Sequence, residues 1–427
     1  MPPRMPRRTL SRIEERALRH VDSKGLIRLL RDLVSIRSFD GAEREAQDFV
    51  AGEMRRSGLA VDRWTFDVGP MRRHRAFSME VERDRGVGVV GKIGRTGGRT
   101  LILNGHVDVV PPGQLSNWRH PPWRATARGG RVYGRGTADM KGGLACAVVA
   151  AKALVESGAI LRGRLLLESV IGEEDGGVGT LAAILRGYRG DGAVVAEPTN
   201  LGIAPAQAGA LCFRILVRGR AAHASVREEG ISAIEKFLPV REALARLERR
   251  RNRRFRHPLF NRYALPYALS LGRLEAGDWP STVPERLVVE GRYGVAIDES
   301  TPAARREFEG AVARAARADP WLRRHPPKVE WWGGQFEPAS VPRTAPIVST
   351  LARAAEDAGG RRPRVAGMTY GSDMRLLVHV AKTPTVLFGP GDVRNAHRPN
   401  EFVEIGQLVE AARTLCLAAL RFCGAED

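Results

Sequence analysis

TLILNGHVD, residues 100–108, is the stretch that says most about the fold of this chain. Its apolar run at 101–103 predicts a short buried strand, and His106 and Asp108 follow at the carboxyl end of that strand. Side chains of a strand alternate between its two faces, so His106 and Asp108 emerge on the same side. Open α/β folds bind their ligands at the carboxyl edge of the sheet. The stretch therefore predicts a site that contains an imidazole and a carboxylate.

Strand-like and helix-like segments alternate around this stretch. The strand-like segments are apolar or alternating runs at 60–66, 87–93, 164–171 and 193–196. Helical patterns lie at 11–36, 142–156 and 179–186. Such alternation is typical of a mainly parallel sheet with helices on both faces. We therefore expect an α/β fold for the larger part of the chain.

The pattern changes at about residue 207 and indicates a second, inserted domain. A strand is followed by a helix, two strands and another helix, at 211–217, 231–249, 267–274, 287–297 and 302–318. A last strand around 329–331 would complete a ferredoxin-like split βαβ unit. We expect a catalytic domain in two parts, 1–206 and 326–427, with a smaller α+β domain inserted at 207–325.

The formal net charge of +20 is the largest anomaly of the composition. Arginines are scattered through predicted helices and no aromatic-rich basic motif accompanies them, so we expect no nucleic-acid partner. No apolar run approaches the length that spans a bilayer. The arginine-rich start (Arg4, Arg7, Arg8, Arg12) lacks the apolar core of a secretory signal, which predicts a cytoplasmic protein without a membrane partner.

The four cysteines, Cys146, Cys212, Cys416 and Cys423, form no Cys-x-x-Cys pair. This spacing indicates neither a thiolate zinc site nor a redox motif. We expect buried free thiols, which suit a reducing compartment.

Five further acidic and histidine side chains stand in settings that suit the same edge of the sheet. These are Asp139, Glu173, Glu174, Glu197 and His397. The aspartate lies in a Gly-rich loop that runs into a helix, the glutamates follow buried strands, and the histidine lies in a Gly/Pro-rich loop. Loops on a rigid sheet can bring such side chains together at one point.

Two imidazoles and several carboxylates, without cysteine, form a set of nitrogen and oxygen ligands. Such ligands suit a pair of zinc ions, with cobalt or manganese as substitutes. A water held between two such ions has its pKa lowered to roughly 7 and becomes hydroxide near neutrality. One glutamate of the doublet would bind metal, and its neighbour would take the proton of the water and pass it to a leaving amine. The predicted chemistry is hydrolysis of an amide or a related carbonyl bond.

The ordered set of motifs, over residues 26–417, resembles the dinuclear zinc amidohydrolase family. This family includes acetylornithine deacetylase, succinyl-diaminopimelate desuccinylase, aminoacylase and glutamate carboxypeptidase. The resemblance implies one zinc on His106, Asp139 and Glu197. It implies a second zinc on Asp139, Glu174 and His397. Glu173 would then be the general base, Asp108 would orient the His106 ring, and the Asp139-Met140 peptide would be cis.

The same resemblance implies that the inserted domain is a lid through which two copies of the chain form a homodimer. His223, in the motif at 221–225, would reach the site of the partner subunit and stabilise the oxyanion of the tetrahedral intermediate. Arg292 occupies the place of an arginine that binds a substrate carboxylate. Family members often have an asparagine in the lid segment where this chain has Ser281 and Thr282, so one of these would bind substrate instead.

The loop at 369–375 resembles a loop that lines the substrate site in the deacetylase-like branch, where Arg375 would contact substrate or pair with Asp373. Removal of an N-acyl group from a small amino acid or amine, as by acetylornithine deacetylase, is the leading expectation. A dipeptidase or carboxypeptidase stays open. So does an N-formyl aminopyrimidine deformylase of thiamin salvage, because of this loop and the stretch at 389–394. A non-catalytic binding protein with the same fold is a further alternative, against which the intact Glu173 argues.

Overall fold

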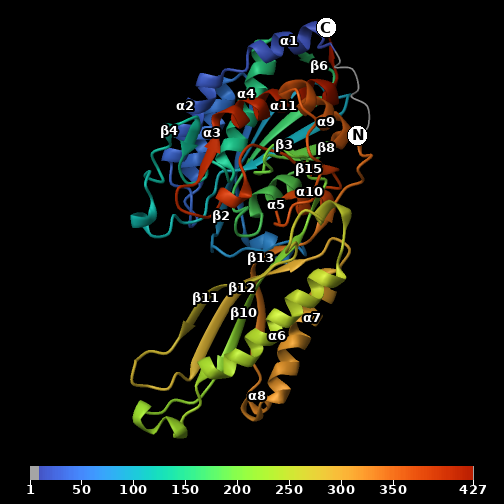
Figure 1. Ribbon diagram of the computed structural model, residues 1–427. Helices are drawn as coiled ribbons and strands as arrows, with labels where there is room; N and C mark the ends of the chain where they lie inside the picture. Colours follow the sequence, from blue (N-terminus) through green and yellow to red (C-terminus); the bar gives the residue numbers. More distant parts are fainter. Residues whose placement is uncertain (1–8, 427) are drawn as a thin grey trace.

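The computed structural model describes residues 9–426, so Arg4, Arg7 and Arg8 of the arginine-rich start lie outside the described residues. A larger part with a six-stranded sheet and a smaller part with a four-stranded sheet make up this region (Figure 1). Among the described residues, no helix is long and apolar enough to cross a membrane.

The six-stranded sheet has the strand order β1-β2-β7-β3-β8-β15. Its strands are β1 (Ala60–Asp67), β2 (Arg85–Gly94), β3 (Thr100–His106), β7 (Arg164–Val170), β8 (Gly192–Val195) and β15 (Thr385–Leu387). The last four run parallel, whereas β2 pairs antiparallel with both β1 and β7. The central strands are nearly continuous apolar runs because both of their faces are buried. The predicted α/β fold with a mainly parallel sheet is confirmed.

Helices cover both faces of this sheet (Figure 1). The helices of the large part are α1 (Arg12–Arg19), α2 (Ser23–Ser35), α3 (Arg44–Arg56), α4 (Lys141–Glu156), α5 (Val178–Leu185), α9 (Pro346–Gly359), α10 (Met374–His379) and α11 (Ile405–Cys423). α4 packs on β3 and β7 and also on α2 and α11, which explains why almost all of its faces are buried. α11 packs on α9, and α5 packs on β2, β7 and α10.

The sequence predicts one helix over 11–36, but the structure divides this segment into α1 and α2. The side chain of Asp22 accepts a hydrogen bond from the backbone N–H of Lys24 and so caps a new helix. Both helices still bury one apolar face, with Leu26 and Leu30 fully buried in α2.

The smaller part is an antiparallel sheet with the order β11-β12-β10-β13, covered by α6 (Ala233–Arg254) and α7 (Thr301–Ala318). Its strands are β10 (Gly209–Arg218), β11 (Leu269–Ala276), β12 (Arg286–Val295) and β13 (Lys328–Phe336). It encloses an apolar cluster of its own. This order is the ferredoxin-like arrangement that the sequence predicts. The expected end of the insertion at 325 lies before β13, which pairs with β10, so the small sheet extends to Phe336.

Shorter elements complete the described chain. The strands are β4 (Thr126–Arg128), β5 (Arg131–Tyr133), β6 (Ile160–Leu161), β9 (Ala206–Gln207), β14 (Ala339–Ser340), β16 (Phe402–Glu404) and β17 (Ala425–Glu426). The helices are α8 (Pro320–Arg324), η1 (Gly69–Arg73), η2 (Leu115–Asn117), η3 (Ala224–Glu229), η4 (Pro258–Phe260) and η5 (Val393–Asn395). β9 pairs with β14 where the chain enters and leaves the small part.

Candidate active site and metal centre

Four neighbouring strands of the large sheet deliver acidic and histidine side chains to one edge. His106 ends β3, Glu173 and Glu174 follow β7, Glu197 follows β8, and His397 lies in the loop after β15. These strands are parallel, so their carboxyl ends share one edge of the sheet. The structure thus brings together residues that the sequence placed at separate strand ends.

Asp139 reaches the same edge from the loop before α4. The Asp139-Met140 peptide is cis, as the resemblance implies. Fully buried Glu401 holds this loop, because its Oε1 accepts hydrogen bonds from the backbone N–H groups of 138–139 at 2.9 and 3.2 Å. Its other oxygen accepts one from Arg135 Nη1 at 2.6 Å. Glu401 was not among the residues predicted from the sequence, where its only signal is its position shortly after His397.

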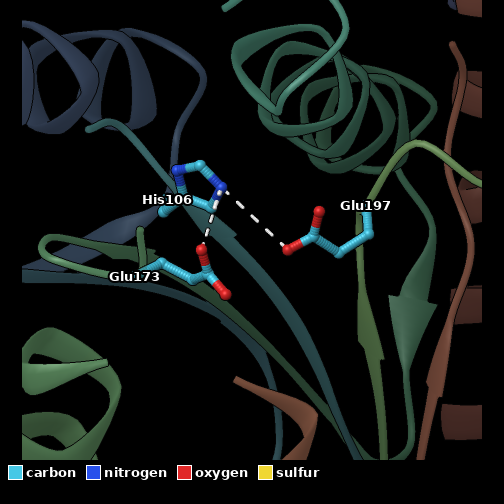
Figure 2. A group of neighbouring side chains, drawn as sticks. All are labelled: His106, Glu173 and Glu197. Carbon is cyan, nitrogen blue, oxygen red and sulfur yellow. Dashed lines mark ion pairs between the residues drawn. The ribbon is translucent and has the colours of Figure 1, made fainter. Parts of the chain in front are cut away.

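The His106 ring lies at the centre of the carboxylates. Its Nε2 atom is 3.4 Å from Asp139 Oδ1, 3.7 Å from Glu173 Oε2 and 4.0 Å from Glu197 Oε1. Figure 2 shows the two glutamates converging on this nitrogen from different loops. Ligand atoms of His106, Glu173 and Glu197 all lie within 4.8 Å of one another, as do those of His106, Asp139 and Glu174.

His397 forms a second corner of the cluster. Its Nε2 atom is 3.0 Å from Glu174 Oε2 and 3.5 Å from Asp139 Oδ2. The two oxygens of Asp139 therefore face one histidine each, His106 and His397. This is the arrangement required of a carboxylate that bridges two metal ions. The histidine side chain is about half exposed, which leaves this corner open to solvent.

The donor set fits divalent zinc. His106 Nδ1 lies 2.9 Å from the backbone carbonyl oxygen of Asp108, an acceptor, so Nδ1 carries the proton and Nε2 keeps its lone pair. His106 Nε2 is buried and makes no hydrogen bond, and the same holds for Glu173 Oε1. Buried polar atoms without partners are costly, and a cation among them would satisfy the nitrogen and the carboxylates together.

The pKa shifts within the cluster also favour bound metal cations. Burial raises the pKa of both Glu173 and Glu197 well above the usual value of a glutamate. Burial opposes ionisation of Asp139 too, but the imidazoles of His106 and His397 lower the pKa of this carboxyl well below its usual range. The Glu174 carboxylate raises the pKa of His397 to about 11. Four carboxyl groups thus crowd around two imidazole rings, an excess of acidic groups that metal cations would balance.

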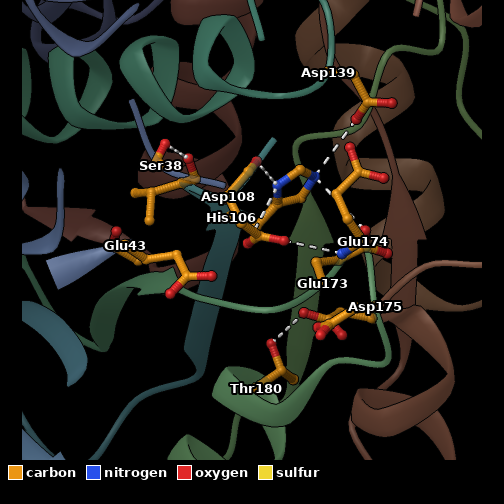
Figure 3. Close-up of polar contacts among 12 residues, drawn as sticks. Ser38, Glu43, His106, Asp108, Asp139, Glu173, Glu174, Asp175 and Thr180 are labelled. Atoms are coloured by element: carbon orange, nitrogen blue, oxygen red, sulfur yellow. Dashed lines mark hydrogen bonds and ion pairs between the residues drawn. The ribbon is translucent and has the colours of Figure 1, made fainter. Parts of the chain in front are cut away.

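Asp108 contacts the cluster differently from the role implied by the resemblance. Its carboxylate Oδ1 is 3.6 Å from His106 Nδ1, whereas its backbone carbonyl oxygen is 2.9 Å away. The carboxylate Oδ2 instead accepts a hydrogen bond of 3.0 Å from the backbone N–H of Glu174 (Figure 3). Asp108 therefore orients the ring through its backbone and holds the glutamate doublet through its side chain.

Two buried arginines hold the turn that carries Glu173 and Glu174. Arg83 pairs with Asp175 and Glu43 at 2.8 Å each. Arg375, only 2% exposed, donates from Nη2 to the carbonyl oxygen of Gly176 at 2.6 Å. It also donates to the Ala76 carbonyl and to Ser78 Oγ. The expected partner Asp373 accepts a hydrogen bond from Thr180 instead. In this structure Arg375 thus contacts the backbone beside the glutamate doublet.

The predicted lid residues His223, Ser281 and Thr282 lie together in the small part. His223 is exposed and caps η3, where its Nδ1 accepts from the Ser225 backbone N–H at 3.1 Å. The Ala224 N–H donates to the Ser281 carbonyl at 2.9 Å, and His223 bridges to Thr282. This segment follows the end of β10 that lies away from the large sheet (Figure 1). A single chain therefore does not bring these three residues to the His106 cluster.

Arg292 does reach the large part. From β12 its Nη2 donates to the backbone carbonyl of Thr369 at 2.8 Å, and burial lowers the pKa of its guanidinium. Tyr370, which follows Thr369 in the chain, was not predicted as a site residue. Its hydroxyl oxygen is buried and has no hydrogen-bond partner, and burial, followed by the charge of Glu197, raises its pKa. In the sequence its signal is an aromatic hydroxyl within a Gly/Ser/Asp turn.

The chain is similar to known proteins along nearly its whole length. A bacterial N-formyl-4-amino-5-aminomethyl-2-methylpyrimidine deformylase from Halalkalibacterium halodurans is 32% identical, over 97% of this chain and 98% of that protein. A protein of the same name from Bacillus subtilis is 30% identical, over 93% of this chain and 94% of that protein.

Solved structures share the fold at lower identity. The dipeptidase Dug1p from Saccharomyces cerevisiae matches with a TM-score of 0.78 and 14% identity, over 98% of this chain and all of that one. The family model described as "Peptidase family M20/M25/M40" matches residues 102–421, which include every residue of the metal cluster. The chain therefore belongs to peptidase family M20/M25/M40.

Proposed function

We propose that this protein is a metal-dependent amide hydrolase that removes the formyl group from N-formyl-4-amino-5-aminomethyl-2-methylpyrimidine. The observation that carries the proposal is the full-length similarity to a deformylase of this substrate, 32% identical over 97% of the chain. It favours the deformylase alternative over the leading expectation of an acetylornithine deacetylase-like enzyme. The likeness to Dug1p, at 14% identity, bears on the fold alone.

The cluster at the sheet edge supports the hydrolytic part of the proposal. His106, Asp139 and Glu197 would hold one zinc ion, and Asp139, Glu174 and His397 a second, with cobalt or manganese as substitutes. Zinc bound there would polarise the amide carbonyl and make an attacking water more acidic. Elemental analysis tests this, and fewer than one transition metal per chain after zinc loading would contradict the two-metal proposal.

Glu173 performs the proton transfers in this proposal. Its buried Oε1 has no hydrogen-bond partner and is free to take a proton from the attacking water. The water oxygen forms a bond to the formyl carbon, the C–N bond breaks, and Glu173 passes the proton to the amine nitrogen that leaves. The products are formate and the free aminomethylpyrimidine. Asp108 keeps the doublet in place through the Glu174 N–H.

The test is a substrate panel with the zinc-loaded enzyme: the formyl-aminopyrimidine, N-acetylornithine, N-acetyl amino acids and dipeptides. Release of formate or amine is measured, with Glu173→Gln as the control for contaminating hydrolases. We expect kcat/KM to be highest for the formyl-aminopyrimidine. A higher value for N-acetylornithine or a dipeptide would overturn the substrate assignment and leave the hydrolase standing. Absence of turnover on the whole panel would favour the non-catalytic alternative.

A further inference from the structure

The loop from Thr369 to Asp373 is fixed at almost every residue. Arg292 holds the Thr369 carbonyl, and Gly371 packs so closely on Phe336 that a Cβ there would overlap the ring. The Ser372 hydroxyl and carbonyl both bond to the Gln207 side chain. Contacts from both parts of the molecule thus leave this backbone little freedom.

Asp373, the last residue of the loop, connects it to the sheet edge where the candidate metal ligands lie. Asp373 Oδ2 accepts a hydrogen bond of 2.6 Å from Thr180 Oγ1, which in turn accepts one of 2.9 Å from Asn104 Nδ2. Asn104 lies in β3 shortly before His106, on the same face of the strand. The loop is therefore tied by buried hydrogen bonds to the strand that carries the central imidazole.

The hydroxyl of Tyr370 differs from the groups that hold this loop. Its ring packs against the main apolar core, yet its hydroxyl oxygen is buried and has no hydrogen-bond partner. A buried donor without a partner is costly, and this one is held in place by a rigid loop. Tyrosine hydroxyls that are buried usually find a partner, so the geometry points to an acceptor supplied by a ligand.

The charged groups that act on this hydroxyl indicate which ligand atom would accept its hydrogen bond. Burial, followed by the charges of Glu197, Asp139 and Glu173, raises the pKa of Tyr370 well above its usual value. The hydroxyl is therefore a neutral donor beside the carboxylate cluster. In amide hydrolysis the atom that gains negative charge there is the carbonyl oxygen of the substrate.

We propose that Tyr370 is a catalytic residue that donates a hydrogen bond from its hydroxyl to the oxygen of the scissile carbonyl as negative charge develops on it. The proposal rests on the proposed amide hydrolysis but not on the identity of the amine. It adds a donor from the same chain as the metal cluster, apart from the donor that the family resemblance implies for His223 of the lid.

Tyr370→Phe tests the proposal because it removes the hydroxyl alone. With the best substrate of the panel, we expect kcat to fall roughly 100-fold, the usual effect of losing one oxyanion donor, with KM changed little. Zinc content should stay at the wild-type value. The thermal midpoint of the free enzyme should not fall, because the variant loses a hydroxyl that has no partner.

Tyr188→Phe is the matched control. The Tyr188 hydroxyl donates to Asp62 Oδ2, so its removal should lower the thermal midpoint and leave kcat unchanged. A Tyr370→Phe variant with kcat within threefold of wild type would overturn the proposal. A rise in KM alone would assign the hydroxyl to ground-state binding, and a loss of zinc or a lower midpoint would make it structural. A wild-type enzyme that hydrolyses no amide would overturn the proposed function, and the role of Tyr370 with it.

Discussion

Glu173 lies in a turn that Asp108 and Arg375 hold through its backbone and Arg83 holds through the Asp175 side chain, but its own Oε1 has no hydrogen-bond partner. A rigid turn with a free buried carboxylate suits a group that must exchange a proton. We predict that Glu173→Gln binds as much zinc as the wild type and loses at least about 100-fold in kcat, the usual scale for a general acid–base group. Elemental analysis and steady-state kinetics check this. Near-normal turnover would remove Glu173 from the role.

We predict that the stability of the protein depends on pH through Glu168, which is not one of the proposed metal ligands. It lies fully buried in β7, where Asn104 Nδ2 donates to it at 3.0 Å and burial raises its pKa to about 7. Because the pKa of Glu168 is higher in the folded than in the unfolded protein, its contribution to the free energy of unfolding is complete below the unfolded pKa of about 4.5. This contribution is lost as the pH rises through 7. The free energy of unfolding should therefore be lower by about 3 kcal/mol above pH 7 than below pH 4.5.

Glu168→Gln replaces the titrating carboxyl group with a neutral amide of nearly the same shape. Between pH 5 and 8 the wild type should therefore lose stability relative to the variant, which thermal midpoints at matched zinc content would show. Glu45→Gln, at an exposed position in α3, is the control and should follow the wild type across this range. A constant difference between wild type and Glu168→Gln would mean that Glu168 ionises normally in the folded protein.

Residues at strand ends could be predicted because each carries its signal locally. His106, Glu173 and Glu197 closely follow apolar runs, and their convergence then follows from parallel strands. Glu401 could not be predicted in this way, since it acts through the backbone of a loop far away in the sequence. The role of Asp108 differs from the prediction because its own backbone carbonyl lies closer to the His106 ring than its carboxylate does.

At the scale of elements, the close approach of α4 to the end of β8 positions Glu197. A Cβ on Gly143 in α4 would overlap the carbonyl oxygen of Ala196, the residue before Glu197. Gly143→Ala must therefore push the helix and the strand end apart. We predict a loss of about 1–3 kcal/mol in stability, typical of overpacking, and weaker zinc binding, measured by thermal unfolding and zinc titration.

Gly52→Ala in α3 is the matched helix control. A Cβ there would meet only the flexible end of Arg56, at 3.4 Å, so the change should stabilise the protein by about 0.5–1 kcal/mol through helix propensity. If Gly143→Ala unfolds at the wild-type temperature and binds zinc equally well, the contact between α4 and β8 does not set the position of Glu197.

Elements with long periodic patterns were predicted, whereas their limits depend on partners that the sequence does not display. The apolar runs of β3, β7 and β8 and the helix–strand order of the small part match the structure. The division of α1 from α2 depends on one capping aspartate, Asp22. The membership of β13 in the small sheet depends on its pairing with β10.

At the scale of the whole molecule, the lid residues and the metal cluster lie in different parts of the chain. His223, Ser281 and Thr282 lie together beyond the end of β10, and of the four predicted lid residues Arg292 is the one that contacts the large part, through Thr369. We propose that the small part, with β13 included, forms a homodimer in which His223 serves the site of the other copy. A symmetric dimer would then contain two sites, each built from both chains.

Mixing two inactive variants tests this arrangement. His223→Ala should lose about 100-fold in kcat if the residue is an oxyanion donor, and Glu173→Gln is inactive for a separate reason. A heterodimer of the two contains one site with both residues intact, so random exchange of subunits should restore about a quarter of wild-type activity. Differently tagged subunits establish that heterodimers have formed, and each variant mixed with itself is the control. Proven heterodimers without recovery would mean that His223 does not act across the dimer.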